Sequence, residues 1–338
     1  MAKKGTEELT LDGALAGLPE DFGFFADRYR TQIQPQLAGR EADRVAAVKR
    51  QQTFTIYGVL AAIAPSVAGF WFFQSPFGLF LGAIAGFGVY AWGSQALNKL
   101  AKETKLMLVE PVSAQFGMAF DCDPPAPGEI MEFRSLGLVP GWDRSSFEDQ
   151  LTGQRGEAPF KFFEAHLEEK RTTTDSKGNT RTTWVTVFRG QCLVAKFHKE
   201  FNGVTKVFRD AGFFNALTKL GQKGQRVKLE DPVFEKAFEV YSTDQIEARF
   251  ILTPDFMERL QKLEKTFQGK QLRCAFAGGQ MLLAVEGKNQ FEPGSMYRPM
   301  DDLDRVRDIL QDFAAVFLLI DAMSSKVTPE GLRPNGVA

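Results

Sequence analysis

The residues best suited to chemistry lie in one short alternating segment. Glu164, His166 and Glu168 are separated by single apolar residues, which predicts a β-strand with the three polar side chains on one face. Such a row could supply metal ligands, or a general base oriented by an acid. A zinc site needs three or four convergent ligands, and the only other histidine is His198, so the alternative is a solvated strand face. These three residues are the candidate catalytic group, and we predict no bound metal and no cofactor.

Other signatures of catalysis have simpler interpretations. Ser242, Thr243 and Asp244 are adjacent, but Ser242 and Gln245 have the spacing of a helix capping box. The chain has no G-x-S-x-G motif, P-loop or G-x-G-x-x-G phosphate cradle. A membrane-tethered hydrolase or metal-dependent enzyme that uses the His166 face is therefore kept as the alternative function.

A local basic stretch suggests a second alternative. Lys219, Lys223, Arg226 and Lys228 could rest on anionic lipid headgroups, each cation contributing about 1 kcal/mol. The competing interpretation is a solvated loop that precedes a helix at Asp231. Nucleic acid is not an expected partner, because the formal net charge is -1 and the aromatic residues follow core-like periodicities.

The element that must position any site is an uncharged run of 48 residues, Gln51 to Asn98, which contains no Asp, Glu, Lys, Arg or His. A single helix of this length would measure roughly 72 Å, whereas the hydrocarbon core of a bilayer is roughly 30 Å thick. Gln74, Ser75 and Pro76 interrupt the apolar pattern. We therefore predict a transmembrane hairpin with spans at 54–73 and 77–97.

The flanks of this run predict its orientation. Arg40, Arg44, Lys49 and Arg50 precede it, while three lysines, Lys99, Lys102 and Lys105, follow it. Cationic residues are retained on the cytoplasmic side, so both termini are expected in the cytoplasm. The first residues have no apolar core that would form a cleavable signal peptide. No ionisable residue of these types lies within the spans, which argues against a transport path.

Small residues recur along both predicted spans. Gly78, Gly82 and Gly86 form two overlapping G-x-x-x-G steps, and the first span has a row of Gly58, Ala62 and Ser66. Such rows allow helix backbones to approach closely in lipid. They serve either as a dimerisation face, which would make a homo-oligomer, or for packing of the hairpin against itself. The short connection favours packing within the hairpin.

Over the whole chain, 25% of the residues are charged and 44% are hydrophobic, which is ordinary for a globular protein. Cys122, Cys192 and Cys274 are odd in number and form no C-x-x-C pair, so we expect free thiols in a reducing cytosol. We predict an α+β protein in five segments: a cytosolic N-terminal helical lead-in (1–50), a transmembrane hairpin (51–98), a cytosolic helix with a proline-rich linker (99–127), a cytosolic domain of antiparallel sheet and helices (128–324) and a flexible tail (325–338).

Local patterns predict the elements of the cytosolic domain. A hairpin is expected around the turn in 172–180, followed by an antiparallel strand pair at 191–199 and 203–208. Gly278 and Gly279 predict a second compact hairpin. Asp231 before Pro232, and Thr253 before Pro254, each predict the start of a helix. A continuous apolar stripe predicts a last helix at 301–323.

Three motifs resemble an uncharacterised bacterial family. They are VFRG-(x)10-FNG-x-T-x-V-x-RD at 187–210, LEDPVFEKAFEVYSTDQIEARFILTPDFMERL at 229–260, and FEP at 291–293. Members of that family carry a two-span hairpin near the N-terminus and a cytosolic domain of unknown function, and the resemblance covers about 18–323. It implies the bacterial inner membrane as the location and supplies no catalytic residues. We therefore expect a membrane-anchored binding or scaffold module, with the lipid bilayer and a protein at the membrane as partners.

Overall fold

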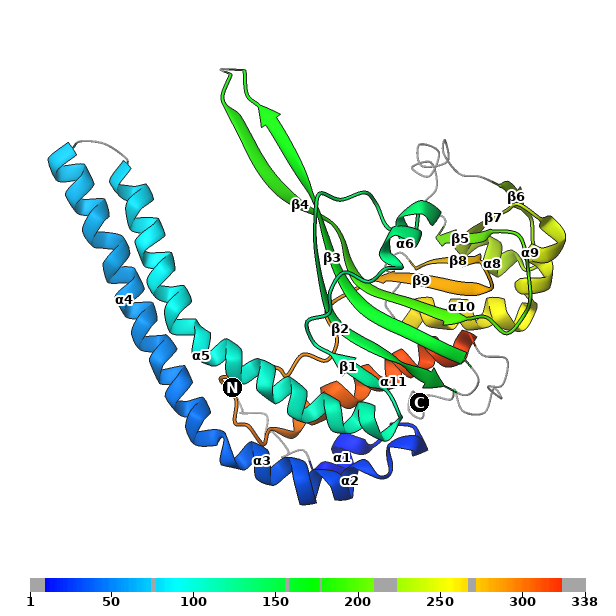
Figure 1. The fold of residues 1–338 in the computed structure, drawn as a ribbon, viewed down its shortest axis with the longest axis horizontal. Helices are drawn as coiled ribbons and strands as arrows, with labels where there is room; N and C mark the ends of the chain where they lie inside the picture. The colour runs from blue at the N-terminus through cyan, green and yellow to red at the C-terminus, as the bar shows by residue number, and fades with distance from the viewer. Residues whose placement is uncertain are drawn as a thin grey trace, which may run out of the picture. The chain divides into compact units, whose positions relative to one another are not determined.

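The structure is a computed structural model that describes residues 10–73, 77–155, 158–176, 178–209, 224–266 and 272–323. The chain forms two compact units. The helical unit comprises Met1–Val112 and Phe291–Leu310, and the sheet unit comprises Ser113–Gln290 and Gln311–Ala338. The protein is thus α+β, with a helical N-terminal region and a large antiparallel sheet, as the sequence predicts (Figure 1).

Short helical segments open the helical unit. Thr10 caps the first of them, because its hydroxyl accepts a hydrogen bond from the Gly13 amide at 3.1 Å. Phe22, Phe25 and Tyr29 are buried, and burial together with Asp301 and Asp302 raises the pKa of Tyr29 to about 12. The segments are α1 (Leu11–Leu15), η1 (Glu20–Phe22), α2 (Phe25–Arg28), η2 (Tyr29–Ile33) and α3 (Gln34–Gly39).

Two long helices follow, α4 (Glu41–Phe73) and α5 (Phe77–Gln115), and they run side by side in Figure 1. The end of the expected lead-in and the first expected span are one continuous helix, because no helix-breaking residue separates Glu41 from the uncharged run. α4 also continues through Pro65, and α5 continues through Pro111. The expected break at Gln74, Ser75 and Pro76 lies outside the described residues.

The segment between the sheet and the last helix belongs to the helical unit and is held by Arg305. This guanidinium is 3% exposed and donates hydrogen bonds to the carbonyl oxygens of Pro293, Ser295 and Pro299. We call residues 291–302 the strap. It leads into α11 (Leu303–Met323), which contains the predicted apolar stripe.

Among the described residues, the sheet unit contains a nine-stranded antiparallel sheet in the order β1-β2-β3-β4-β9-β8-β5-β7-β6. The strands are β1 (Ala119–Asp121), β2 (Arg144–Arg155), β3 (Ala158–Thr174), β4 (Thr180–Lys196), β5 (Thr205–Arg209), β6 (Gln225–Val227), β7 (Phe238–Ser242), β8 (Arg273–Ala277) and β9 (Gln280–Glu286).

Both predicted hairpins are present, but the predicted meander is wrong. β3 pairs with β4, and β8 pairs with β9 around Gly278 and Gly279, which have φ values of 57° and 75°. β4 does not pair with β5, because β9 takes its place beside β4 while β5 pairs with β7 and β8. The strand order therefore depends on contacts between residues that are distant in sequence, and local sequence patterns do not predict such contacts.

The helices of the sheet unit that precede α11 are α6 (Ile130–Leu136), α8 (Pro232–Ala237), α9 (Gln245–Ile251) and α10 (Pro254–Thr266). Polar side chains cap the last three, whereas no side chain caps α6. Asp231 caps α8 as predicted, accepting from the Val233 and Phe234 amides. The cap of α9 is Asp244 and not Ser242, because Asp244 is the residue that accepts from Ile246 and Glu247. Thr253 accepts from the Phe256 amide at the start of α10.

The core of the sheet unit lies against α6 and the central strands. Phe133, Phe163, Leu167 and Phe188 are each 0–1% exposed and belong to one apolar cluster. On the opposite face of β8 from Ala275 and Ala277 of this cluster, the Phe276 ring lies 4.9 Å from the Phe197 ring between centroids, in an edge-on arrangement.

β3 and β4 extend beyond their neighbours as a two-stranded ribbon (Figure 1). β2 pairs with β3 only as far as Glu168, and β9 pairs with β4 only from Gly190 onward. We call Glu169–Thr174 and Thr180–Val185 the β-arm. Its threonine hydroxyls pair across the strands, at 3.3 Å for Thr172 and Thr182. The β-arm therefore exposes polar side chains and unpaired strand edges.

Candidate functional site

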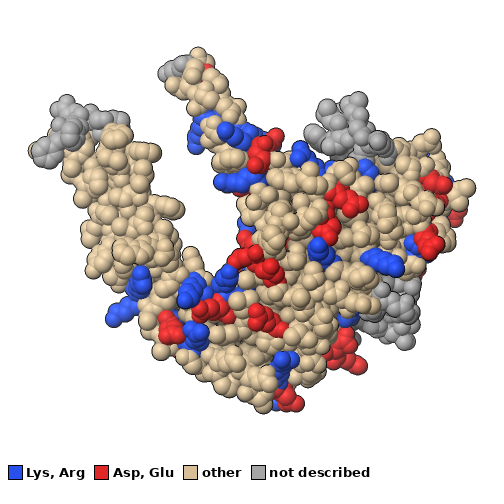
Figure 2. Space-filling model, viewed as in Figure 1, with Lys and Arg blue, Asp and Glu red and all other residues tan. Residues whose placement is uncertain are grey.

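The surface of α4 and α5 is apolar and exposed. In the most apolar 18-residue stretch of each helix, only a small share is buried within the protein: 11% for the first helix and 28% for the second. Trp71 is 78% exposed and Phe87 is 73% exposed. In Figure 2 the visible face of these helices carries no charged side chain above its base, where Lys and Arg gather. Both helices are long and apolar enough, by length and composition, to cross a membrane.

The predicted glycines lie at the contact between the two helices. A Cβ atom at Gly82 would lie 2.2 Å from the Ala62 carbonyl oxygen, and one at Gly86 would lie 2.7 Å from the Gly58 carbonyl oxygen. At Gly78 it would lie 2.6 Å from the Cα of Gly69. The glycines are therefore positioned to let α4 and α5 approach within one chain.

A polar network marks the start of the uncharged run. Gln51 is 8% exposed, and its Oε1 accepts a hydrogen bond from the Tyr297 hydroxyl at 2.5 Å. Its Nε2 donates to the Ser94 hydroxyl at 3.3 Å and to the Tyr90 hydroxyl at 3.5 Å. The network joins α4, α5 and the strap. It lies at Gln51, where the charged residues that precede the uncharged run end.

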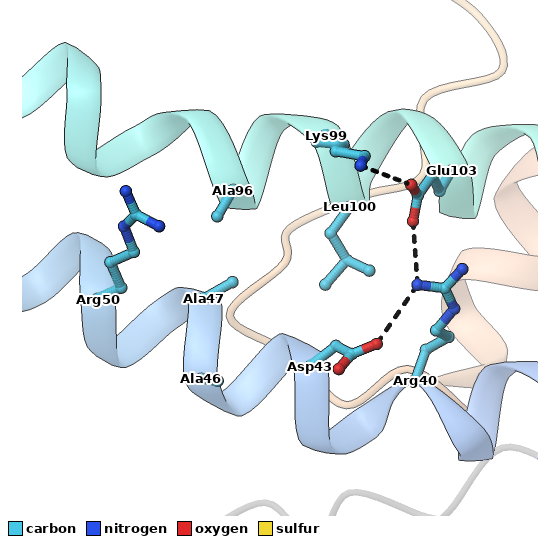
Figure 3. Close-up of a pocket in the computed structure, with 9 residues that line it drawn as sticks. All are labelled: Arg40, Asp43, Ala46, Ala47, Arg50, Ala96, Lys99, Leu100 and Glu103. Carbon is cyan, nitrogen blue, oxygen red and sulfur yellow. Dashed lines mark hydrogen bonds and ion pairs between the residues drawn. The ribbon is translucent and has the colours of Figure 1, made fainter.

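A cavity of about 310 Å³ lies between α4 and α5, and its lining includes Arg50, the residue that directly precedes Gln51. Figure 3 shows Arg50 pointing from α4 toward α5 at one end of it, and an ion-paired group at the other end. Alanine side chains between the two ends leave the space open. The lining residues are Arg40, Asp43, Ala46, Ala47, Arg50, Ala96, Lys99, Leu100 and Glu103.

The charges of this cavity are unevenly paired. Arg40 contacts both Asp43, at 3.3 Å, and Glu103, at 3.2 Å. Lys99 reaches Glu103 at 3.8 Å with a side chain that is 80% exposed. The Arg50 guanidinium lies 5.4 Å from the centroid of the Phe54 ring and has no carboxylate partner among the described residues. The cavity thus presents an available cation toward the uncharged run.

The sheet unit has a separate open cavity of about 550 Å³ at the base of the β-arm. Arg134 lies over the Trp142 ring, 5.2 Å from its centroid, and Arg171 forms an ion pair with Glu169 at 3.0 Å. Asp143 accepts a hydrogen bond from the Lys170 amide at 2.8 Å. The wall is therefore a mixed polar and aromatic surface on which Arg171 and Glu169 neutralise each other.

The predicted His166 row does not form one group of converging side chains. Glu164 is 4% exposed and accepts from the Gln290 amide at 2.5 Å, while Glu168 pairs with Arg144 at 2.5 Å. The His166 Nε2 lies 2.9 Å from the Thr186 hydroxyl. In the described part of the chain, His166 belongs to no group of three potential ligands within 4.8 Å of one another. The three residues thus serve separate local contacts.

The basic stretch can be followed only in part. Lys219 and Lys223 lie outside the described residues. Arg226 forms an ion pair with Glu239 at 3.5 Å, and the Lys228 carbonyl oxygen accepts a hydrogen bond from Arg249 at 3.3 Å. The two described members of the stretch therefore take part in contacts within the sheet unit.

In the sequence, Arg40, Arg50 and Lys99 indicate only the orientation of the hairpin. Their convergence depends on the pairing of α4 with α5, which brings the two flanks of the uncharged run together. The available signal was the hairpin itself, because two charged flanks of one tight hairpin must lie side by side. The role of the strap, which contributes Tyr297 to the network, has no local signal in the sequence.

The molecule is therefore an α+β protein with two exposed apolar helices and a charged cavity at their base. Residues 186–325 match the model of a family described as "Protein of unknown function (DUF3137)", in agreement with the expected resemblance to an uncharacterised family. No curated protein matches the chain. A crystal structure of the mycobacterial trehalose monomycolate transport factor A, TtfA, matches with 9% identity and a TM-score of 0.33, and covers 65% of this chain and 96% of that chain.

Proposed function

We propose that this chain is a two-span protein of the bacterial inner membrane whose sheet unit acts in the cytoplasm as a binding or scaffold module. The observation that carries the proposal is the exposed apolar surface of α4 and α5. It includes Ile56, Val59, Leu60, Ile63, Val67, Phe70, Trp71, Phe77, Leu79, Phe80, Leu81, Ile84, Phe87 and Trp92, each at least 46% exposed.

Lipid explains this surface energetically. Removing one large apolar side chain from water contributes about 1.5–3 kcal/mol. Over the side chains just named, which are already partly buried within the protein, the total is at least comparable to the roughly 5–15 kcal/mol that stabilises a folded protein. Burial of the two helices in a bilayer removes this surface from water without any further protein partner.

The charged flanks support the direction of insertion. Arg50 and Lys99 both lie at the base of the paired helices, beside the same cavity. Retention of cations on the cytoplasmic side would place this base, and the chain segments that leave it, in the cytoplasm. The short connection between the spans then leaves the cytoplasmic units to carry out the function.

The β-arm supports a binding role for the sheet unit. Its two strands have outer edges that pair with no other described strand, and strand edges of this kind can accept a strand from a partner protein. Most of its exposed side chains are polar, and the Arg144 guanidinium lies over the exposed Trp184 ring, 4.6 Å from its centroid, so the β-arm can stay accessible without aggregating. We place the interaction with a protein partner on this ribbon.

Alkaline extraction of membranes, combined with reporter fusions at both ends of the chain, tests the proposal. We expect the full chain to stay in the membrane pellet and both reporters to show cytoplasmic activity. Release into the supernatant would contradict the anchor, and one external reporter would contradict the two-span topology.

A photo-crosslinking amino acid at Thr173 tests the binding role in native membranes. We expect one discrete product from Thr173 in the β-arm, and no such product from Val233, which is 66% exposed on α8. Equal labelling from both positions would show that the β-arm is not the interaction surface.

A further inference from the structure

The cavity between α4 and α5 combines an available guanidinium, an exposed ammonium and a position at the end of the uncharged run (Figure 3). We propose that it binds the phosphate group of an anionic glycerophospholipid from the surrounding leaflet. The proposal rests on the membrane insertion proposed above and adds a specific ligand class and its residues.

Arg50 is the principal phosphate ligand. It directly precedes Gln51, the first residue of the uncharged run, so it lies where lipid phosphates meet the hydrocarbon region. Its guanidinium stacks on Phe54 and has no ion pair within the described residues. A planar guanidinium can bind two phosphate oxygens at once, which a lysine cannot do.

Lys99 is the second phosphate ligand, contributed from α5. Its contact with Glu103 is long, at 3.8 Å, and its side chain is 80% exposed. The ammonium can therefore turn toward a phosphate held by Arg50 without breaking a buried contact. Two cations from two helices fix the position of the anion between the helices.

The far end of the cavity recognises the rest of the headgroup. Asp43 and Glu103 are held in place by Arg40 and present carboxylate oxygens that accept hydrogen bonds from hydroxyl groups. Ala46, Ala47 and Ala96 leave room for a small polyol such as glycerol. The acyl chains would then lie along the exposed apolar face of α4 and α5.

Native mass spectrometry of the full chain in a non-ionic detergent tests this site. Phosphatidylglycerol and phosphatidylcholine are added separately, and the fraction of protein that retains one lipid is measured. We expect retention of phosphatidylglycerol, and a loss of at least about fivefold in Arg50→Gln and in Lys99→Gln, the change that corresponds to about 1 kcal/mol per cation.

Two further variants separate the cavity from general charge. Lys49→Gln removes the same charge beside Arg50 in sequence but outside the cavity lining, and retention is expected to stay within about twofold of the unmodified chain. Ala46→Phe fills the cavity without changing charge, and it is expected to abolish retention. Each variant must show an unchanged thermal unfolding midpoint in detergent, so that loss of lipid does not reflect misfolding.

Three outcomes would overturn the inference. Equal retention of the two lipids, or equal losses in Arg50→Gln and Lys49→Gln, would show that no specific phosphate site exists. Full competition by soluble glycerol 3-phosphate at an equal concentration would identify a site for a free phosphate ester instead of a lipid. If alkaline extraction retains the chain in membranes while lipid selectivity is absent, only this inference fails and the proposed anchor stands.

Discussion

Tyr297 and Gln51 are joined by a hydrogen bond of 2.5 Å, although 246 positions separate them in sequence. Tyr297 lies in the strap, within the region that matches the family model, and Gln51 is the first residue of the uncharged run on α4. The bond is reinforced nearby, because the Arg44 guanidinium donates to the Met296 carbonyl oxygen at 3.1 Å. The strap is thus fastened to the base of the apolar helices.

Tyr297→Phe removes only the hydroxyl of this contact. Gln51 is buried and would lose one hydrogen-bond partner, so we expect the full chain to be destabilised by about 1 kcal/mol. Thermal unfolding in detergent measures the change. The Gln51→Leu variant already lacks the acceptor, so adding Tyr297→Phe to it should not lower stability further. If Tyr297→Phe lowers stability equally in the unmodified chain and in Gln51→Leu, the hydrogen bond contributes nothing.

Gly82→Leu should separate α4 from α5. A Cβ atom at Gly82 would lie 2.2 Å from the Ala62 carbonyl oxygen and 2.4 Å from the Ser66 hydroxyl oxygen, so the helices must move apart. Gly88 is the matched control, because a Cβ there meets nothing within 4 Å. Cysteines introduced on facing turns of the two helices report the spacing. We expect disulfide formation to fall in Gly82→Leu only, and equal rates in both variants would argue against this packing.

Glu164 and His166 should respond differently to truncation. Glu164 is buried and accepts hydrogen bonds from the Gln290 amide and, at 3.5 Å, from the Gln191 side chain. Glu164→Ala leaves these donors without their acceptor, so we expect a loss of about 1–3 kcal/mol in the free energy of unfolding. His166→Ala should change it by less than about 0.5 kcal/mol. Urea unfolding followed by tryptophan fluorescence measures both losses. A larger loss for His166→Ala than for Glu164→Ala would contradict this assignment of contacts.

The cysteines provide a test of the core. Cys192 and Cys274 are each 0% exposed, and burial raises the pKa of both thiols, whereas Cys122 is partly exposed. Thiolate is the reactive form, so at neutral pH a thiol reagent should label one cysteine quickly and all three only after unfolding. Rapid labelling of two or three in the folded chain would contradict the packing of β4 and β8.

The same burial predicts the direction of a pH effect. Below the ordinary thiol pKa of about 8.5, the Cys192 and Cys274 thiols are protonated in both the folded and the unfolded chain, so their contribution to the free energy of unfolding does not change with pH. Above it, the unfolded chain ionises while the buried thiols stay protonated, so the free energy of unfolding should fall as the pH rises. The double variant Cys192→Ser, Cys274→Ser should show a weaker dependence of the free energy of unfolding on pH. An unchanged dependence would show that these two thiols are not its source.

Much of the fold could be predicted because its signals are local. The absence of charge over Gln51–Asn98 indicates the apolar helices, and Asp231 before Pro232 marks the start of α8. The placement of β9 beside β4 could not be predicted, because it depends on side-chain packing between strands about 90 positions apart in sequence. The cavity at Arg50 and Lys99 also depends on packing, because its two cations come from different helices and lie beside one cavity only when α4 and α5 pair.

The central claim, a membrane-anchored chain with its sheet unit in the cytoplasm, is tested most directly by labelling a cysteine at Thr173 in the β-arm. The background carries Cys122→Ser, which leaves only the two buried native thiols. A membrane-impermeant maleimide is applied to intact spheroplasts and to inside-out membrane vesicles. We expect labelling of Thr173→Cys in the inside-out vesicles alone, whereas labelling in intact spheroplasts would show that the β-arm lies outside the cytoplasm.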